Sequence, residues 1–230
     1  MSQNHLEQVK CPVCHYDSPM TMWNFVDGVS NPELKEKLLN GEIYDWKCEV
    51  CGHEAKVPFG TIYVDYQNRF MLFYYPVESE VEQEPILVAP LAENINVKDF
   101  TLRRVIGINN LREKLTIFEA GLNDIAIERL KYFQKLDHDL DFHPEDTVYF
   151  LGIDTDPEIC KANNCERGII KFIILREGSE PRFKGFQTEL YYDYLLAVNK
   201  DPRMKTEDCP QVDWKWMDEK LRSYGWILAI

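Results

Sequence analysis

Short runs in which hydrophobic and polar residues alternate recur along the chain, and they predict β-strands. Stretches with apolar residues three or four positions apart predict helices. Aromatic and β-branched residues strengthen several of the strand predictions. Strands are expected at residues 20–28, 43–48, 61–67, 69–76, 100–108, 147–153, 168–175, 182–190 and 225–230. Helices are expected at residues 32–40, 109–120, 125–136 and 214–222.

Capping residues set the expected helix boundaries. Ser30 or Asn31 can cap the first helix, and Pro32 suits its first turn. The Asn40-Gly41 pair can end it. The N-caps expected for the next two helices are Asn109 or Asn110, and Asn123 or Asp124.

Helices and strands do not alternate regularly, so the expected fold class is α+β. A Glu-rich stretch follows the hairpin expected around Gln67-Asn68 and is the best candidate for a domain boundary. The prediction is an N-terminal domain at residues 1–76, an acidic linker or edge segment at 77–98, and a mixed helix-and-sheet body at 99–230.

Four of the seven cysteines form two C-x-x-C pairs, in "KCPVCHYD" and "KCEVCGHE". A C-x-x-C loop turns the backbone so that both sulfur atoms face one point, and two such loops supply the four thiolates that tetrahedral zinc prefers. Gly52 suits a positive φ after the second pair. The sequence therefore predicts one structural Zn²⁺ in an N-terminal zinc ribbon with a short helical insert. Its ligands would be Cys11, Cys14, Cys48 and Cys51.

Other chemistries can use cysteines at this spacing. A redox pair works at the N-terminus of a helix, but Asp17, Ser18 and Pro19 follow Cys14 too closely for a helix beginning at Cys11. An iron tetrathiolate uses similar loops and differs mainly in the metal. Free thiols would not be expected to double the motif, and an odd number of cysteines without a secretory signal is not typical of a disulfide scaffold. The doubled spacing favours zinc among these alternatives.

Composition limits the partners. The formal net charge is -13, and residues 1–60 contain five Lys and no Arg against nine Asp and Glu. Nucleic-acid binding usually rests on Lys and Arg contacts to phosphates, so nucleic acid is disfavoured as a partner. No apolar run is long enough for a transmembrane helix, and the first ten residues lack the apolar region of a signal peptide. A cytoplasmic location is expected, with no membrane partner.

Four segments together resemble the CpXC family of bacterial and archaeal proteins. They are "CPVC", "NPELKEKLLNGEIYDWKCEVCGHE", "TIYVDYQNRFMLFYYP" and "LREKLTIFEAGLNDIAIERLK". The resemblance covers about residues 8 to 135. It implies four metal ligands and no particular activity. The second pair reads C-E-V-C and lacks the family's proline, which stiffens the loop and does not bind metal.

The remaining candidate residues form weaker patterns. The segment "LDHDLDFHPED" places carboxylates from Asp137 to Asp146 near two histidines, which could form a second metal site or an acid-base site. Phe142 and Val148 occupy the Gly and Glu positions of an EF-hand, which excludes that mode of calcium binding. Cys160, Cys165 and Cys209 lack a fourth ligand. His15 and His53 adjoin the cysteine pairs and could replace a ligand.

These patterns favour a zinc-stabilised module that binds a protein partner, which could be a second copy of the chain. An enzyme with a carboxylate site in the C-terminal part is one alternative, although no complete catalytic motif is present. A nucleic-acid-associated regulator is the other.

Overall fold

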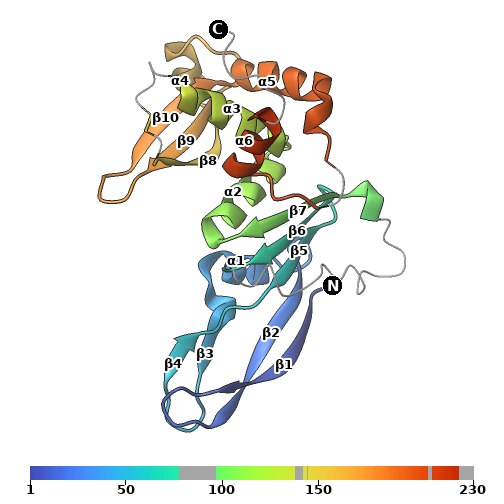
Figure 1. The fold of residues 1–230 in the computed structure, drawn as a ribbon, viewed down its shortest axis with the longest axis vertical. Coiled ribbons are helices and arrows are strands. Elements are labelled where there is room, and N and C mark those ends of the chain that lie inside the picture. Colours follow the sequence, from blue (N-terminus) through green and yellow to red (C-terminus); the bar gives the residue numbers. More distant parts are fainter. Residues whose placement is uncertain (78–96, 138–141, 144, 207–208, 223–230) are drawn as a thin grey trace. The chain divides into compact units, whose positions relative to one another are not determined.

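The computed structural model describes the chain except residues 78–96, 138–141, 144, 207–208 and 223–230. The chain divides into two compact units, residues 1–111 and 112–230 (Figure 1). Helices and strands occur in both units, which confirms the expected α+β class. No helix among the described residues has the length and apolar character needed to cross a membrane.

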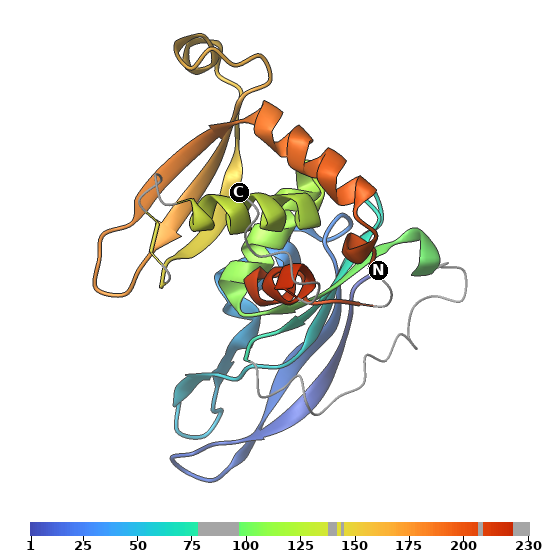
Figure 2. The same cartoon turned by 45° about the horizontal axis from the view of Figure 1, so that its top comes forward.

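The first unit is built on a five-stranded sheet. Its strands are β1 (Gln3–Lys10), β2 (Asp17–Asp27), β5 (Thr61–Asp65), β6 (Phe70–Tyr75) and β7 (Thr101–Ile106). Their order is β1-β2-β5-β6-β7. The pairs β1–β2 and β5–β6 are antiparallel, whereas β2–β5 and β6–β7 are parallel. β1 and β2 extend beyond the rest of this sheet to the loop that joins them (Figures 1 and 2).

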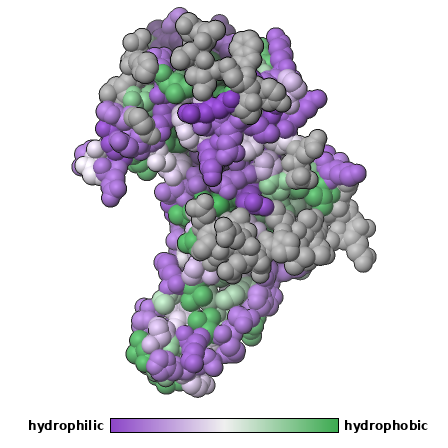
Figure 3. Space-filling model, viewed as in Figure 1, coloured by the Kyte–Doolittle hydropathy of each residue, from purple (hydrophilic) through white to green (hydrophobic). Residues whose placement is uncertain are grey.

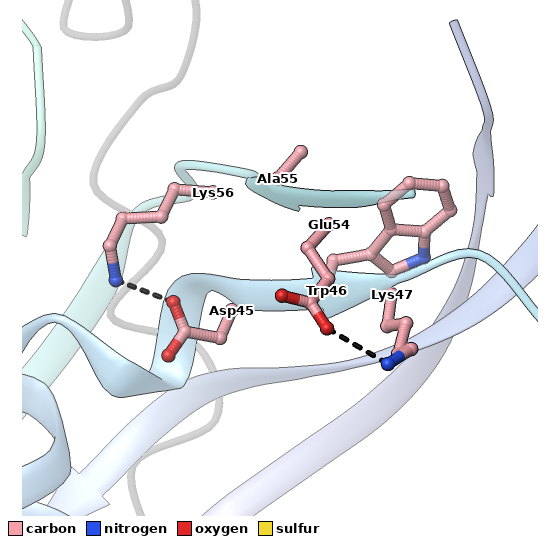
Figure 4. A pocket seen from close by; sticks show the side chains of 6 residues that line it. All are labelled: Asp45, Trp46, Lys47, Glu54, Ala55 and Lys56. Carbon is pink, nitrogen blue, oxygen red and sulfur yellow. Dashed lines mark hydrogen bonds and ion pairs between the residues drawn. The ribbon is translucent and has the colours of Figure 1, made fainter. Parts of the chain in front are cut away.

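A helix and a second hairpin are inserted between β2 and β5. They are α1 (Pro32–Asn40), β3 (Asp45–Lys47) and β4 (Glu54–Lys56). Asn31 is the N-cap residue of α1, Pro32 begins it, and Gly41 ends it with a φ of 75°. Each of these was expected from the sequence. On the β3–β4 hairpin, Lys47 pairs with Glu54 and Lys56 pairs with Asp45 (Figure 4). These exposed ion pairs satisfy the charges that line the surface pocket there.

The core of the first unit lies on β5 and β6. All six residues of β6 are buried, as are Tyr63 and Val64 of β5. The turn between the two strands is at Gln67-Asn68, as expected. The Asp65 carboxylate accepts hydrogen bonds from the backbone N–H groups of both turn residues, at 2.9 and 2.8 Å. This local capping fixes the register of the hairpin.

The second unit contains a three-stranded antiparallel sheet in the order β10-β9-β8. The strands are β8 (Thr147–Asp154), β9 (Ile169–Leu175) and β10 (Arg182–Gln187). Apolar side chains of the sheet and helices form one core, which includes Phe172, Leu130, Tyr191 and Met217. Its helices are α3 (Asp124–Leu136), α4 (Pro157–Ala162), α5 (Thr188–Lys200) and α6 (Trp214–Arg222). Short 3-10 helices occur in both units: at Glu42–Tyr44 and Val97–Asp99 in the first, and at Pro202–Met204 in the second.

Several predicted boundaries differ from the structure. α2 (Ile108–Glu119) begins before the expected caps, so Asn109 and Asn110 lie inside the helix. Asn123 does cap α3, and its side chain accepts the N–H of Ala126 at 3.0 Å. The strand expected at residues 182–190 ends at Gln187, where α5 follows. Neither α4 nor α5 was predicted.

The division between the compact units lies between Leu111 and Arg112, within α2. The sequence placed the start of the C-terminal body at residue 99. β7 instead belongs to the sheet of the first unit, because it pairs with β6. Most of the predicted linker at 77–98, and the strand expected at 225–230, lie outside the described residues.

Candidate metal centre

The first C-x-x-C pair forms the loop between β1 and β2, residues 11–16, which we call the first knuckle. The backbone N–H of Cys11 donates to the carbonyl of Tyr16 at 2.9 Å. The N–H of His15 donates back to the carbonyl of Cys11 at 3.0 Å. These two bonds close a tight loop directly on an antiparallel strand pair.

The second pair forms the loop between β3 and β4, residues 48–53, which we call the second knuckle. It repeats the same bonds: Cys48 N–H donates to His53 O at 2.9 Å, and Gly52 N–H donates to Cys48 O at 3.0 Å. Gly52 has a φ of 73°, as expected from the sequence, and His15 has a φ of 59° at the equivalent position. The two knuckles therefore share the same backbone hydrogen bonds and a positive φ at the same position.

The four cysteine sulfurs converge between the knuckles. The Sγ atoms of Cys11 and Cys51 are 3.6 Å apart, and those of Cys14 and Cys48 are 3.5 Å apart. All four Sγ atoms lie within 4.8 Å of one another. Both short separations join one knuckle to the other, so the cluster links two hairpins that are distant in the sequence.

These separations fit a tetrahedral metal ion. Sulfur atoms about 2.3 Å from a central zinc stand about 3.8 Å apart at the corners of a tetrahedron. The two short separations are close to that value, whereas a disulfide would bring two sulfurs to about 2.05 Å. The residues present could therefore hold one metal ion in an all-sulfur shell.

Two of the four cysteines belong to a small buried apolar cluster. Cys11 and Cys48 are fully buried, and they pack with Met20 and Trp46. Cys51 is exposed. The first cysteine of each pair therefore anchors its knuckle in the protein.

Ser18 is part of the site and was not singled out in the sequence. Its hydroxyl donates to the Sγ of Cys48 at 3.6 Å and accepts the N–H of Glu49 at 3.1 Å. Its carbonyl accepts the indole N–H of Trp46 at 3.4 Å. Ser18 lies on the buried face of β2, the face that also carries Met20. One feature of the sequence could have indicated this role. Ser18 stands where the alternation of β2 places a buried residue, and a buried hydroxyl requires a hydrogen-bond partner.

Hydrogen bonding favours the thiolate form at the first cysteine of each pair. The backbone N–H of Cys51 bonds to the Cys48 sulfur and, with Ser18, lowers the pKa of this thiol to about 6 despite burial. At Cys11 burial opposes ionisation, but backbone N–H groups of Cys14 and Val13 lower the pKa below its usual value. Two thiolates, one from each knuckle, are thus already favoured electrostatically.

The second cysteine of each pair has the opposite shift. At Cys14 a backbone hydrogen bond from Tyr16 lowers the pKa, but burial and bonds to neighbouring thiols outweigh it and raise the pKa to about 12. At Cys51 a backbone bond from His53 also lowers the pKa, but burial and the neighbouring thiols of Cys11 and Cys48 raise it overall. Four thiolates cannot share this small space without a cation, since like charges repel. A bound metal cation would supply the missing positive charge.

The carboxylate and histidine candidates at residues 137–146 are only partly covered by the structure. Of the segment 137–146, residues 138–141 and 144 lie outside the described residues, which leaves the predicted Asp139, Asp141 and His138 without a structural test. Asp137 is exposed. The Asp146 carboxylate is buried and pairs with two arginines, Arg176 at 2.8 Å and Arg182 at 2.6 Å. Both of its oxygens are engaged, and the pairs link residues at or beside the ends of β8, β9 and β10.

We expect Asp146→Asn to lower the free energy of unfolding by about 2 kcal/mol at pH 7. Burial opposes ionisation of Asp146, but the two arginines and the His143 N–H outweigh it and lower the pKa to about 2. The stabilisation is therefore present above about pH 4 and is lost as the pH falls through about 2. Urea unfolding of both proteins at pH 7, 5 and 3 measures it. A difference that does not shrink by roughly half at pH 3 contradicts this account.

The remaining cysteines and histidines lie outside the cluster. Among the described residues, the group of potential metal ligands that lies close together contains the four cysteines and neither His15 nor His53. Cys160 and Cys165 lie in the connection between β8 and β9, and Cys209 precedes α6. All three are partly exposed, and none of them forms a disulfide in the described part of the chain.

A family model described as CpXC protein matches residues 9–131. The chain belongs to the CpXC family. The CpXC match includes both knuckles, the insert with α1, and the chain up to α3, which confirms the resemblance seen in the sequence. The β8–β9–β10 sheet and the last three cysteines lie beyond the CpXC match. Searches of the curated proteins and of the solved structures found no match.

Proposed function

We propose that this CpXC protein is a zinc-stabilised protein-interaction module. A single structural Zn²⁺ closes a zinc ribbon formed by the two knuckles, with α1 as its helical insert. The ligands in this proposal are Cys11, Cys14, Cys48 and Cys51. The observation that carries the proposal is the convergence of their four sulfurs at separations that suit a tetrahedral ion.

The donor set supports a structural role for the metal. Four thiolates fill a tetrahedral shell, so no position remains for a water molecule or a substrate. The ion would instead join two hairpins whose shared apolar cluster is small. A metal in such a place stabilises the fold directly.

The exposed surface beside the metal supports a protein partner. Val13 and Val50 occupy the third position of the two C-x-x-C motifs and are 62% and 61% exposed. Tyr16 in the first knuckle is 50% exposed. Hydrophobic residues reach the surface at the knuckle end of the first unit (Figure 3). We call the side chains of Val13, Val50 and Tyr16 the knuckle tip. We propose that the knuckle tip docks against apolar side chains of another protein in the cytoplasm.

We expect the double substitution Val13→Asp/Val50→Asp to reduce partner capture at least about tenfold, because each valine buries apolar surface in the complex. Both side chains are exposed, so zinc content should not change. The matched control is Val29→Asp. Val29 is 46% exposed and follows the far end of β2, roughly 30 Å along the strand from the first knuckle.

Tagged versions of the three proteins would be cross-linked in native cells and their partners quantified by mass spectrometry. The proposal requires a protein that the wild type and Val29→Asp capture equally and the double variant loses. Equal capture by all three proteins would exclude the knuckle tip as the docking surface. A zinc-free wild-type protein would contradict the structural role separately from the interaction.

A further inference from the structure

Two cysteines in the second unit are brought together by a local turn. Cys160 lies in α4, and Cys165 lies beyond its end in the connection to β9. The C-cap of α4 is Asn163, and Asn164 then takes a left-handed conformation with a φ of 49°. This reverses the chain and returns Cys165 toward Cys160. Both thiols are free and partly exposed.

Hydrogen bonds fix this approach. The backbone N–H of Cys165 donates to the carbonyl of Cys160 at 3.0 Å, and the Cys165 thiol donates to the same carbonyl at 3.6 Å. With standard backbone dimensions, the first bond holds the two Cα atoms within about 7 Å, the limit that a disulfide can span. The turn therefore holds the backbones of the two cysteines within the range that a disulfide can span.

A metal site is not the better explanation of this pair. Two carboxylates near Cys160 have other partners: Asp154 pairs with Lys171 at 3.1 Å, and Asp156 caps α4 by accepting the N–H of Glu158 at 2.8 Å. Two thiols alone do not make a closed metal shell. The arrangement suits a dithiol.

We propose that Cys160 and Cys165 are an oxidation site that forms a reversible intramolecular disulfide. With glutathione disulfide as the oxidant, the thiolate of Cys165 attacks one glutathione sulfur and releases one glutathione thiolate. The Cys160 sulfur then loses its proton, attacks the Cys165 side of the mixed disulfide and releases the second glutathione. Two electrons and two protons pass from the protein to yield two glutathione molecules. Disulfides of this kind in reducing compartments are transient and redox-sensing.

The order of the two steps follows from the environment of Cys160. Burial, the Cys165 thiol and the charges of Asp154 and Asp156 raise the pKa of Cys160. It therefore stays protonated at neutral pH and is the second thiol to react. Closing the bond would fix the end of α4 to the start of the β9 connection.

The test uses the full zinc-loaded chain in glutathione buffers of increasing oxidised fraction, with acid quenching, alkylation and trypsin digestion. Lys161 lies between the two cysteines, so the disulfide joins peptides 136–161 and 162–167. We expect this linked pair to accumulate with oxidation, to revert with dithiothreitol and to be unaffected by Cys209→Ser. Cys160→Ser should leave a stable mixed disulfide of glutathione on Cys165.

Two results would overturn the proposal. One is that both thiols of the wild type still react fully with the alkylating agent at every oxidised fraction of glutathione. The other is that either cysteine links to Cys209 or to a second chain in preference to its neighbour. Zinc content, measured in the same samples, separates this reaction from oxidation of the knuckles.

Discussion

Cys48→Ser is expected to abolish zinc binding and to release the knuckle region from the folded state. Cys48 is 1% exposed and joins the first knuckle through its 3.5 Å approach to Cys14. Metal binding in small units of this kind contributes on the order of 10 kcal/mol to folding. The supporting apolar cluster is too small to replace that contribution. Protection from hydrogen exchange should therefore fall in residues 9–22 and 44–57.

The same experiment tests how far the effect reaches. β6 is buried along its whole length, so its amides should keep more protection than the knuckles. The second unit has its own core and should keep its protection. Cys209→Ser is the matched control, with unchanged zinc content and exchange. Equal loss of protection along the chain would mean that both units fold as one cooperative domain. Unchanged protection in the knuckles would mean that the metal is not structural.

Lys131→Met is expected to lower the free energy of unfolding by about 3–5 kcal/mol at pH 7.5. Lys131 of α3 is 8% exposed and bridges two buried carboxylates, Glu113 at 2.9 Å and Glu128 at 2.8 Å. A second lysine, Lys114, pairs with Asp124 at 2.9 Å beside them. Three buried carboxylates therefore share two ammonium groups. Removing Lys131 leaves three buried carboxylates with the single ammonium group of Lys114.

The pH dependence of the loss follows from Glu128. Burial raises the pKa of this carboxyl, and attraction to Lys131 and Lys114 lowers it. Without Lys131 its pKa rises further, so the folded variant binds a proton more readily than the unfolded chain. The variant should therefore recover stability relative to wild type as the pH falls from 7.5 to 5.

Urea unfolding of the variant and wild type at both pH values measures these changes. Lys161→Met, at an exposed position of α4, should change the free energy of unfolding by less than about 0.5 kcal/mol. The double variant Lys131→Met/Glu113→Gln removes one charge of each sign and keeps an acceptor for the Phe150 N–H, which bonds to Glu113 at 2.6 Å. It should be more stable than Lys131→Met alone. A smaller stability in the double variant would contradict the charge argument.

The candidate site could be predicted from the sequence because its geometry is local. A C-x-x-C loop needs a turn and a positive φ at the fourth residue after its first cysteine, and both depend on residues within the loop. The flanking strands β1 and β4 were not predicted. Gly52 and the insert helix ended by Gly41 are examples. Ser18 was missed because its role depends on which residue faces it across the site.

Features that depend on distant contacts could not be predicted. β7 pairs in parallel with β6 across a long connection, so no local pattern assigns it to the first sheet. The strand expected at residues 182–190 ran into the start of α5, and the rest of α5 was not predicted, although its buried residues Thr188, Tyr191 and Val198 follow helical spacing. The buried cluster around Lys131 consists of charged residues that a sequence pattern places on the surface.

X-ray absorption spectroscopy of the purified protein tests the central claim most directly, because it reports both the identity of the metal and its ligands. The account predicts one zinc per chain with four sulfur neighbours at about 2.3 Å and no nitrogen or oxygen neighbour. The same spectrum should be obtained when Cys160, Cys165 and Cys209 are all replaced by serine. An iron spectrum, a mixed shell with nitrogen or oxygen, or a metal-free protein would contradict it.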